Sequence, residues 1–152
     1  MRSYRSHRSC RSYSDAYDTA FAWRTSRGFF DRLWGRHVPP GGEPVEEINS
    51  AEAEARLAAQ PTTQLLDVRE PEELDEDGFI PGSVHIPMPE IESRWSELDP
   101  ARPIIVYCAA GMRSYNVGCY LAGRGFTAVA SLRGGLRAWH GEIARRSDGR
   151  RT

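Results

Sequence analysis

One cysteine, Cys108, lies where its thiol could act as a nucleophile. It follows an apolar run at residues 104–107 and precedes a short glycine-containing loop that ends in Arg113. We expect the run to form a strand that is covered on both faces, and a helix to begin after the loop at Ser114. Ligands of such α/β folds bind at the carboxyl ends of parallel strands, which is the position predicted for Cys108.

The loop after Cys108 is suited to stabilising negative charge. Ala109, Ala110 and Gly111 have small side chains or none, so their backbone N–H groups can converge on an anion. The N-terminus of the following helix adds the positive end of its dipole, and Arg113 adds a permanent positive charge. No His or Asp beside Cys108 in the sequence could act as a base. The loop itself must therefore favour the thiolate, which is the nucleophilic form of cysteine.

The elements that position this loop alternate between strands and helices from residue 44 onwards. Short apolar runs predict strands at residues 45–48, 64–68, 84–86, 104–107 and 127–131. Helices are expected at residues 50–59, from residue 71 to the turn at Gly78, and at residues 89–98, 114–124 and 135–139. Gly125 is expected to end the fourth helix in a left-handed conformation. This alternation predicts an α/β domain with a central parallel sheet of about five strands and helices on both faces.

Four ordered motifs resemble those of the single-domain rhodanese, or thiosulfate sulfurtransferase, family. They are LLDVRE at 65–70, IPGS at 80–83 with IP at 86–87, VYCAAGMRS at 106–114, and LRGG at 132–135 with Trp139. The resemblance runs from residue 44 to about residue 142. It implies a rhodanese-like fold and a two-step reaction. Cys108 would take sulfane sulfur from a donor such as thiosulfate as a persulfide, and pass it to cyanide, a thiol or a partner protein.

The resemblance also implies roles for individual residues. Cys108 would be the catalytic nucleophile, and Arg113 would hold the anionic donor. The outer sulfur would be cradled by backbone N–H groups of Ala109, Ala110, Gly111, Met112, Arg113 and Ser114. Asp67 and Arg69 are expected to be supporting scaffold, with Asp67 binding backbone donors near the loop and Arg69 pairing with an acidic residue. The family usually has a His before its Ile-Pro-Gly motif, where this chain has Phe79, so local hydrogen bonding should differ there.

The length of the loop separates this chain from related phosphatases. Cysteine phosphatases, including those that share the fold, use C-x5-R, whose extra residue makes room for a tetrahedral phosphate. This chain has the shorter C-x4-R, so we favour sulfur transfer over phosphatase or arsenate reductase chemistry. A further alternative is a sulfur-relay or regulatory binding module. It would serve a protein partner docked through residues 14–38, with little turnover of small molecules.

Composition restricts the possible partners and compartments. The 20 basic residues, all of them Arg, nearly balance 21 acidic ones, so a nucleic-acid partner is not expected. Three widely spaced cysteines form neither a disulfide framework nor a metal-binding pair, and the histidines also lack metal-ligand spacing. We therefore expect no metal, no cofactor, no membrane span and a cytoplasmic location. Helical spacing places Cys119 on the flank of its helix, where a resolving role in redox chemistry remains an alternative.

Composition also divides the chain into three parts. Residues 1–42 are expected to be an N-terminal extension, disordered or partly helical, that ends in a Pro/Gly linker. An aromatic and arginine cluster at residues 27–36 suits docking on the domain or on a partner better than a membrane anchor. Residues 43–143 are expected to form the rhodanese-like domain, and residues 144–152 a flexible tail.

Overall fold

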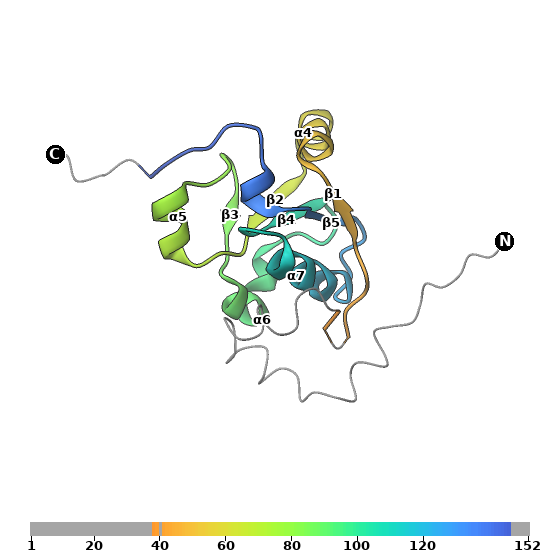
Figure 1. The fold of residues 1–152 in the computed structure, drawn as a ribbon. Coiled ribbons are helices and arrows are strands. Elements are labelled where there is room, and N and C mark those ends of the chain that lie inside the picture. The colour runs from red at the N-terminus through yellow and green to blue at the C-terminus, as the bar shows by residue number, and fades with distance from the viewer. Residues whose placement is uncertain (1–37, 40, 147–152) are drawn as a thin grey trace.

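A sheet of five parallel strands organises the structure, a computed structural model that describes residues 38, 39 and 41–146 (Figure 1). The strands are β1 (Glu46–Ile48), β2 (Gln64–Asp67), β3 (Val84–His85), β4 (Ile104–Tyr107) and β5 (Val129–Leu132). They are ordered β1-β5-β4-β2-β3, so β4 is central. The predicted α/β fold with a central parallel sheet is confirmed, and β4 has the central place expected of it.

The apolar sequence of β4 is explained by its neighbours on every side. Val106 pairs with Leu66 of β2 on one side and with Ser131 of β5 on the other. Because side chains alternate along a strand, Ile104 and Val106 belong to one core cluster, while the other two residues of β4 belong to a second. All four residues of the strand are buried. A strand of this kind needs apolar residues at consecutive positions, as the sequence has.

Helices cover both faces of the sheet, with α4 above it and α6 and α7 below it in Figure 1. The helices are α4 (Ser50–Ala59), α5 (Pro71–Asp77), α6 (Ile91–Arg94) and α7 (Met112–Ala122). Three short 3-10 helices complete the layers, namely η1 (Met88–Glu90), η2 (Trp95–Glu97) and η3 (Gly135–Ala138). Among the described residues, none of these helices combines the length and the hydropathy that a bilayer-spanning segment requires.

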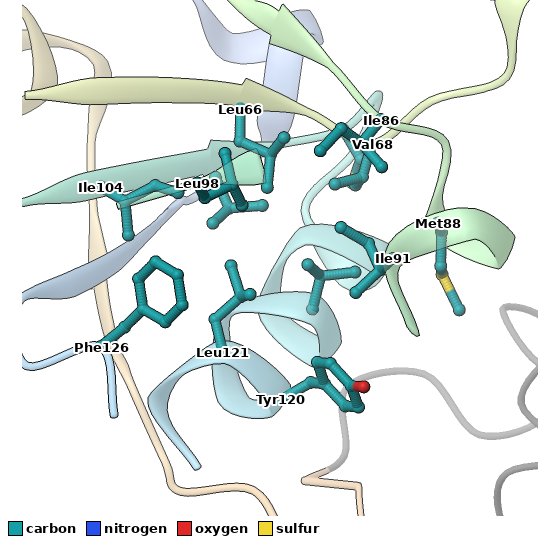
Figure 2. Packing of buried hydrophobic residues seen from close by; sticks show 13 residues of the cluster. Leu66, Val68, Ile86, Met88, Ile91, Leu98, Ile104, Tyr120, Leu121 and Phe126 are labelled. Carbon is teal, nitrogen blue, oxygen red and sulfur yellow. The ribbon is translucent and has the colours of Figure 1, made fainter. Parts of the chain in front are cut away.

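The larger core cluster fills the space between the sheet and α7 (Figure 2). Leu66 and Ile104 come from the sheet, whereas Tyr120, Leu121 and the nearby Phe126 come from α7 and the turn after it. Each fully buried aliphatic or aromatic side chain of this kind stabilises the fold by roughly 1.5–3 kcal/mol. This packing fixes α7 against β4, and thereby fixes the loop that joins them.

Local signals set most of the helix ends. Asn49 caps α4 by accepting a hydrogen bond from the N–H of Glu52, whose side chain in turn binds the N–H of Asn49. After α7, Gly125 has a φ of 95°, and the N–H of Phe126 binds the carbonyl of Leu121. This is the left-handed glycine cap expected at Gly125, in the Schellman arrangement.

Several element boundaries differ from the sequence expectation: for example, α7 ends at Ala122, and the last expected helix is the 3-10 helix η3. Helix α7 begins at Met112 rather than Ser114, because Gly111 has a φ of 105° and so turns the chain directly into the helix. Residues 88–97 form a 3-10, α and 3-10 series rather than one helix, and the turns place Trp95 edge-on against Phe126. Strand β5 begins at Val129, two residues later than expected, where pairing with Ile104 starts.

The two ends of the described part contact the domain. The N–H of Glu43 donates to the carbonyl of Cys119 in α7 at 2.9 Å. At the other end, Ala144 exchanges two backbone hydrogen bonds with Phe79, and Arg146 pairs with Asp75 of α5. Contacts with the domain therefore continue beyond residue 143, where the flexible tail was expected to begin. The expectations for residues 1–37, including the aromatic and arginine cluster, lie outside the described residues.

Candidate active site

Cys108 lies at the carboxyl end of β4 with backbone donors directed at its sulfur. Its Sγ accepts hydrogen bonds from the N–H of Gly111 at 3.0 Å and from the N–H of Ser114 at 3.4 Å. The first donor belongs to the loop and the second to the first turn of α7. The side chain is only 1% exposed, so little water competes for these donors. Two of the predicted loop residues thus place their N–H groups on the sulfur, where they favour negative charge.

Two serine hydroxyls continue this hydrogen-bond network. The Cys108 thiol donates to Ser114 Oγ at 3.5 Å, while Ser114 Oγ shares a hydrogen bond of 3.0 Å with Ser131 Oγ. Both serines are fully buried. Because a hydroxyl can rotate and either donate or accept, Ser114 could donate to the sulfur once the thiol is ionised. Ser131 lies outside the sequence motifs that point to the site, although β5 is parallel to β4 and its end lies at the same edge of the sheet.

Glycines allow the turn after β5 to lie against the reactive loop. The N–H groups of Leu136 and Arg137 donate to the carbonyls of Cys108 at 2.7 Å and Ala109 at 3.1 Å. A Cβ atom at Gly135 would overlap both of these carbonyl oxygens. Gly135 is therefore required by the close approach of two backbones, and it holds the loop from the side opposite α7.

Arg113 is bound by an acidic partner that the sequence analysis did not identify. Its two terminal nitrogens donate to the two carboxylate oxygens of Glu73 in α5, at 2.8 and 2.9 Å. Burial disfavours the charged form of Glu73, but the bonds from Arg113 and from the N–H of Glu70 hold its pKa below the usual value. The structure thus shows Arg113 in an ion pair, and contact with an anionic donor stays a prediction. The sequence feature that could have pointed to Glu73 as the partner is its position in the helix that follows β2.

Asp67 and Arg69 form a fully buried ion pair beside the loop. Arg69 Nη2 lies 2.6 Å from Asp67 Oδ2, and neither side chain is exposed. Asp67 Oδ1 also accepts from a backbone donor, the N–H of Arg69, at 3.0 Å. Arg69 donates further to the carbonyl of Gly78 at 2.8 Å. The pair therefore joins the end of β2 to the end of α5.

Tyr107 and His85 complete the support around this pair. The Tyr107 hydroxyl accepts from the N–H of Ile80 at 3.0 Å, and its ring lies 5.6 Å from the Arg69 guanidinium. Burial raises the pKa of Tyr107 well above its ordinary value, so the hydroxyl stays protonated. His85 Nε2 hydrogen-bonds the carbonyl of Arg69 at 2.7 Å. Tyr107 and His85 thus hold the segment at residues 80–83 and the carboxyl end of β2 in place relative to β4.

A cavity of about 350 Å³ lies beside the reactive loop. We call it the loop cavity; its wall is formed by Arg69, Asp77, Ala109, Leu136, Arg137 and Ile143. A second cavity, of about 320 Å³, is lined by the first residues of β4 and β5. Because the strands are parallel, this second cavity lies at the end of the sheet opposite Cys108.

Cys119 does not have the flank position that helical spacing predicted. Its side chain is fully buried, with 0% exposed. The segment entering the domain covers this side of α7, since a Cβ atom at Gly42 would lie 2.7 Å from the carbonyl oxygen of Cys119. Cys119 thus lies within α7 beside the segment at Gly42, whereas Cys108 lies in the loop at the edge of the sheet, so the structure gives no support to a resolving role for Cys119.

Comparison with known proteins leads to the same fold. The family model described as "Rhodanese-like domain" matches residues 49–142, and the chain belongs to this family. A protein of Allochromatium vinosum named sulfurtransferase is 40% identical over 95 residues, which cover 62% of this chain and 88% of the relative. The thiosulfate sulfurtransferase GlpE of Pseudomonas syringae is 39% identical over 75 residues, 49% of this chain and 70% of the relative. A solved rhodanese-like domain protein from Staphylococcus aureus matches with a TM-score of 0.61 at 30% identity, covering 68% of this chain and 100% of its own.

Proposed function

We propose that this protein is a sulfurtransferase that moves sulfane sulfur from a thiosulfate-like donor to a thiophilic acceptor through a persulfide on Cys108. The observation that carries the proposal is the pair of backbone N–H groups, from Gly111 and Ser114, within hydrogen-bond distance of Cys108 Sγ. Membership of the rhodanese-like family, with relatives named as sulfurtransferases, supports the same reaction class. The proposed compartment is the cytoplasm, where the reducing environment keeps Cys108 unpaired.

In the first step, the Cys108 thiolate attacks the outer sulfur of thiosulfate. A new S–S bond forms at Cys108 while the S–S bond of thiosulfate breaks, and sulfite leaves with the electron pair. The electron pair of Sγ enters the new bond, and the electron pair of the broken bond goes to the departing sulfite. The N–H groups of Gly111 and Ser114 already point at Sγ, so they stabilise the attacking thiolate without any reorganisation.

In the second step, an acceptor attacks the outer sulfur of the persulfide. With cyanide, a C–S bond forms, the S–S bond to Cys108 breaks, and thiocyanate leaves. Cys108 returns to the thiolate and receives the same two backbone hydrogen bonds. The Ser114 hydroxyl donates to the carbonyl of Gly111 at 3.3 Å while Cys108 is a thiol, and by rotating it would supply a third donor to the anionic sulfur. We propose that Arg113 attracts the anionic donor. The donor must compete with the Glu73 carboxylate for the Arg113 guanidinium.

The test is the formation of thiocyanate from thiosulfate and cyanide by the purified full-length protein. We expect saturable turnover with both substrates, with sulfite released in the first step. Incubation with an aryl phosphate is the parallel assay for phosphatase chemistry, which the short C-x4-R loop disfavours. Phosphate release without thiocyanate formation would contradict the proposal.

A protein acceptor is the second candidate, favoured by the exposure of one apolar side chain at the start of α7. Met112, four residues after Cys108, is 42% exposed. Exposed apolar side chains are common singly, but one beside a reactive sulfur offers a contact for a docking partner. In this case a persulfide would form on Cys108, and neither cyanide nor small thiols would remove its sulfur efficiently.

A further inference from the structure

The loop cavity is lined by three charged residues, of which Arg69 is already paired with Asp67 and the other two are opposite in charge. Asp77 is the last residue of α5 and Arg137 belongs to η3, and both residues are exposed. Within the described residues, neither charged group takes part in an ion pair or a side-chain hydrogen bond. Nearby charges are paired, as Arg113 is with Glu73 and Arg146 with Asp75. Asp77 and Arg137 are therefore available to a bound molecule.

Both elements that carry these charges are fixed relative to the reactive loop. The N–H of Arg137 donates to the carbonyl of Ala109 at 3.1 Å, so η3 is joined to the residue next to Cys108. The end of α5 is held by Arg69, which donates to the carbonyl of Gly78, the residue after Asp77. A molecule bound between the two charges would thus lie beside the loop at a defined place.

The remaining wall of the loop cavity suits an organic molecule. Leu136 and Ile143 supply apolar surface in the same wall as the two charged residues. A volume of about 350 Å³ is at the lower end of the range of about 300–1,000 Å³ found for small-molecule sites. Cyanide would leave most of this space empty, and a purely anionic molecule would leave the Asp77 carboxylate without a partner.

We infer that the loop cavity binds the sulfur acceptor, a small thiol that carries both an ammonium and a carboxylate group, as cysteine does. Arg137 would bind the carboxylate and Asp77 the ammonium, while the carbon chain lies against Leu136 and Ile143. The inference rests on the proposed function, because it requires a persulfide on Cys108. Arg137 and Asp77 would select the acceptor, although the transfer reaction itself does not require them.

The transfer to such a thiol is balanced without any further reactant. The acceptor thiolate attacks the outer sulfur of the Cys108 persulfide, and a new S–S bond forms on the acceptor. The S–S bond to Cys108 breaks, and Cys108 keeps the electron pair as a thiolate. The acceptor leaves as a persulfide, so sulfur changes carrier with no net oxidation or reduction.

The test compares three acceptors with thiosulfate as the donor. Cysteine has both charged groups, cysteamine lacks the carboxylate, and 3-mercaptopropionate lacks the ammonium. Arg137→Gln is expected to lower the ratio of kcat/KM for cysteine to that for cysteamine by about tenfold. Asp77→Asn is expected to lower the ratio for cysteine to 3-mercaptopropionate by a similar factor. Ratios are compared between proteins, so differences in thiol nucleophilicity cancel.

Arg133→Gln is the matched control, because Arg133 is exposed on the same turn but lies outside the loop cavity. It is expected to keep both ratios at their wild-type values. Wild-type ratios in Arg137→Gln and Asp77→Asn, together with normal transfer to cyanide in the wild type, would overturn the inference and leave the proposed function standing. Failure of the wild type to transfer sulfur to any acceptor would overturn both.

Discussion

Replacing Cys108 with serine is expected to lower kcat/KM for transfer from thiosulfate to cyanide by at least about 10³-fold. A serine hydroxyl is not ionised at neutral pH, and its oxygen cannot form the S–S bond that carries the transferred sulfur. The loop donors from Gly111 and Ser114 would remain, but they would have no anionic sulfur to stabilise. Thiocyanate formation by purified wild type and variant measures the effect.

Cys119→Ala is the matched control for the nucleophile. Cys119 is a second described free cysteine, and it is fully buried in α7. Its replacement should leave the transfer rate near that of the wild type, because the proposed reaction uses no second thiol. Substantial turnover by Cys108→Ser would assign the chemistry to another group and remove the basis of the proposed function.

Arg69→Met is expected to lower the free energy of unfolding by about 3–5 kcal/mol, the usual cost of removing one partner of a buried ion pair. The variant leaves the Asp67 carboxylate without its guanidinium in a place where neither side chain is exposed. The carbonyl of Gly78 also loses the hydrogen bond from Arg69. Urea unfolding followed by far-UV circular dichroism measures the change, with the slope of the transition checked for two-state behaviour.

The double variant Asp67→Leu/Arg69→Met separates burial of charge from loss of packing. Replacing both partners leaves no unpaired charge, so the double variant should be more stable than Arg69→Met alone. It should still be less stable than the wild type, because the carbonyl of Gly78 remains without its donor. A loss below about 1 kcal/mol in the single variant would show that Asp67 is solvated in solution, as exposed ion pairs are.

Features that depend on local sequence could be predicted for this protein. The apolar run of β4 indicated a central strand, and Gly125 indicated the end of α7, as the structure shows. The capping side chain at Asn49 follows from the same kind of signal. These signals lie within a few residues of the element they specify, so no knowledge of the tertiary structure is needed.

Features that depend on packing between distant segments could not be predicted. Glu73 meets Arg113 across 40 positions of the sequence, and Ser131 meets Ser114 across 17. Neither contact has a spacing that periodicity could reveal. The burial of Cys119 has the same origin, because the segment at Gly42 covers a helix face that spacing alone leaves on the flank.

For the same reason, the backbone donors around Cys108 could be predicted from the sequence, whereas the specificity of the site for its acceptor could not. A glycine-containing loop before a helix N-terminus predicts backbone donors on a sulfur from sequence alone. The loop cavity, however, brings together Asp77 and Arg137, which come from separate helices. Recognition of the acceptor is therefore a property of the folded chain.

The most direct test of the central claim is the mass of the protein after incubation with thiosulfate. The account predicts a gain of one sulfur atom, located by peptide mapping on Cys108, and its loss on addition of cyanide or cysteine. The gain should be absent in Cys108→Ser. An unchanged mass, or added sulfur on Cys10 or Cys119, would contradict the assignment of Cys108 as the residue that carries the sulfur.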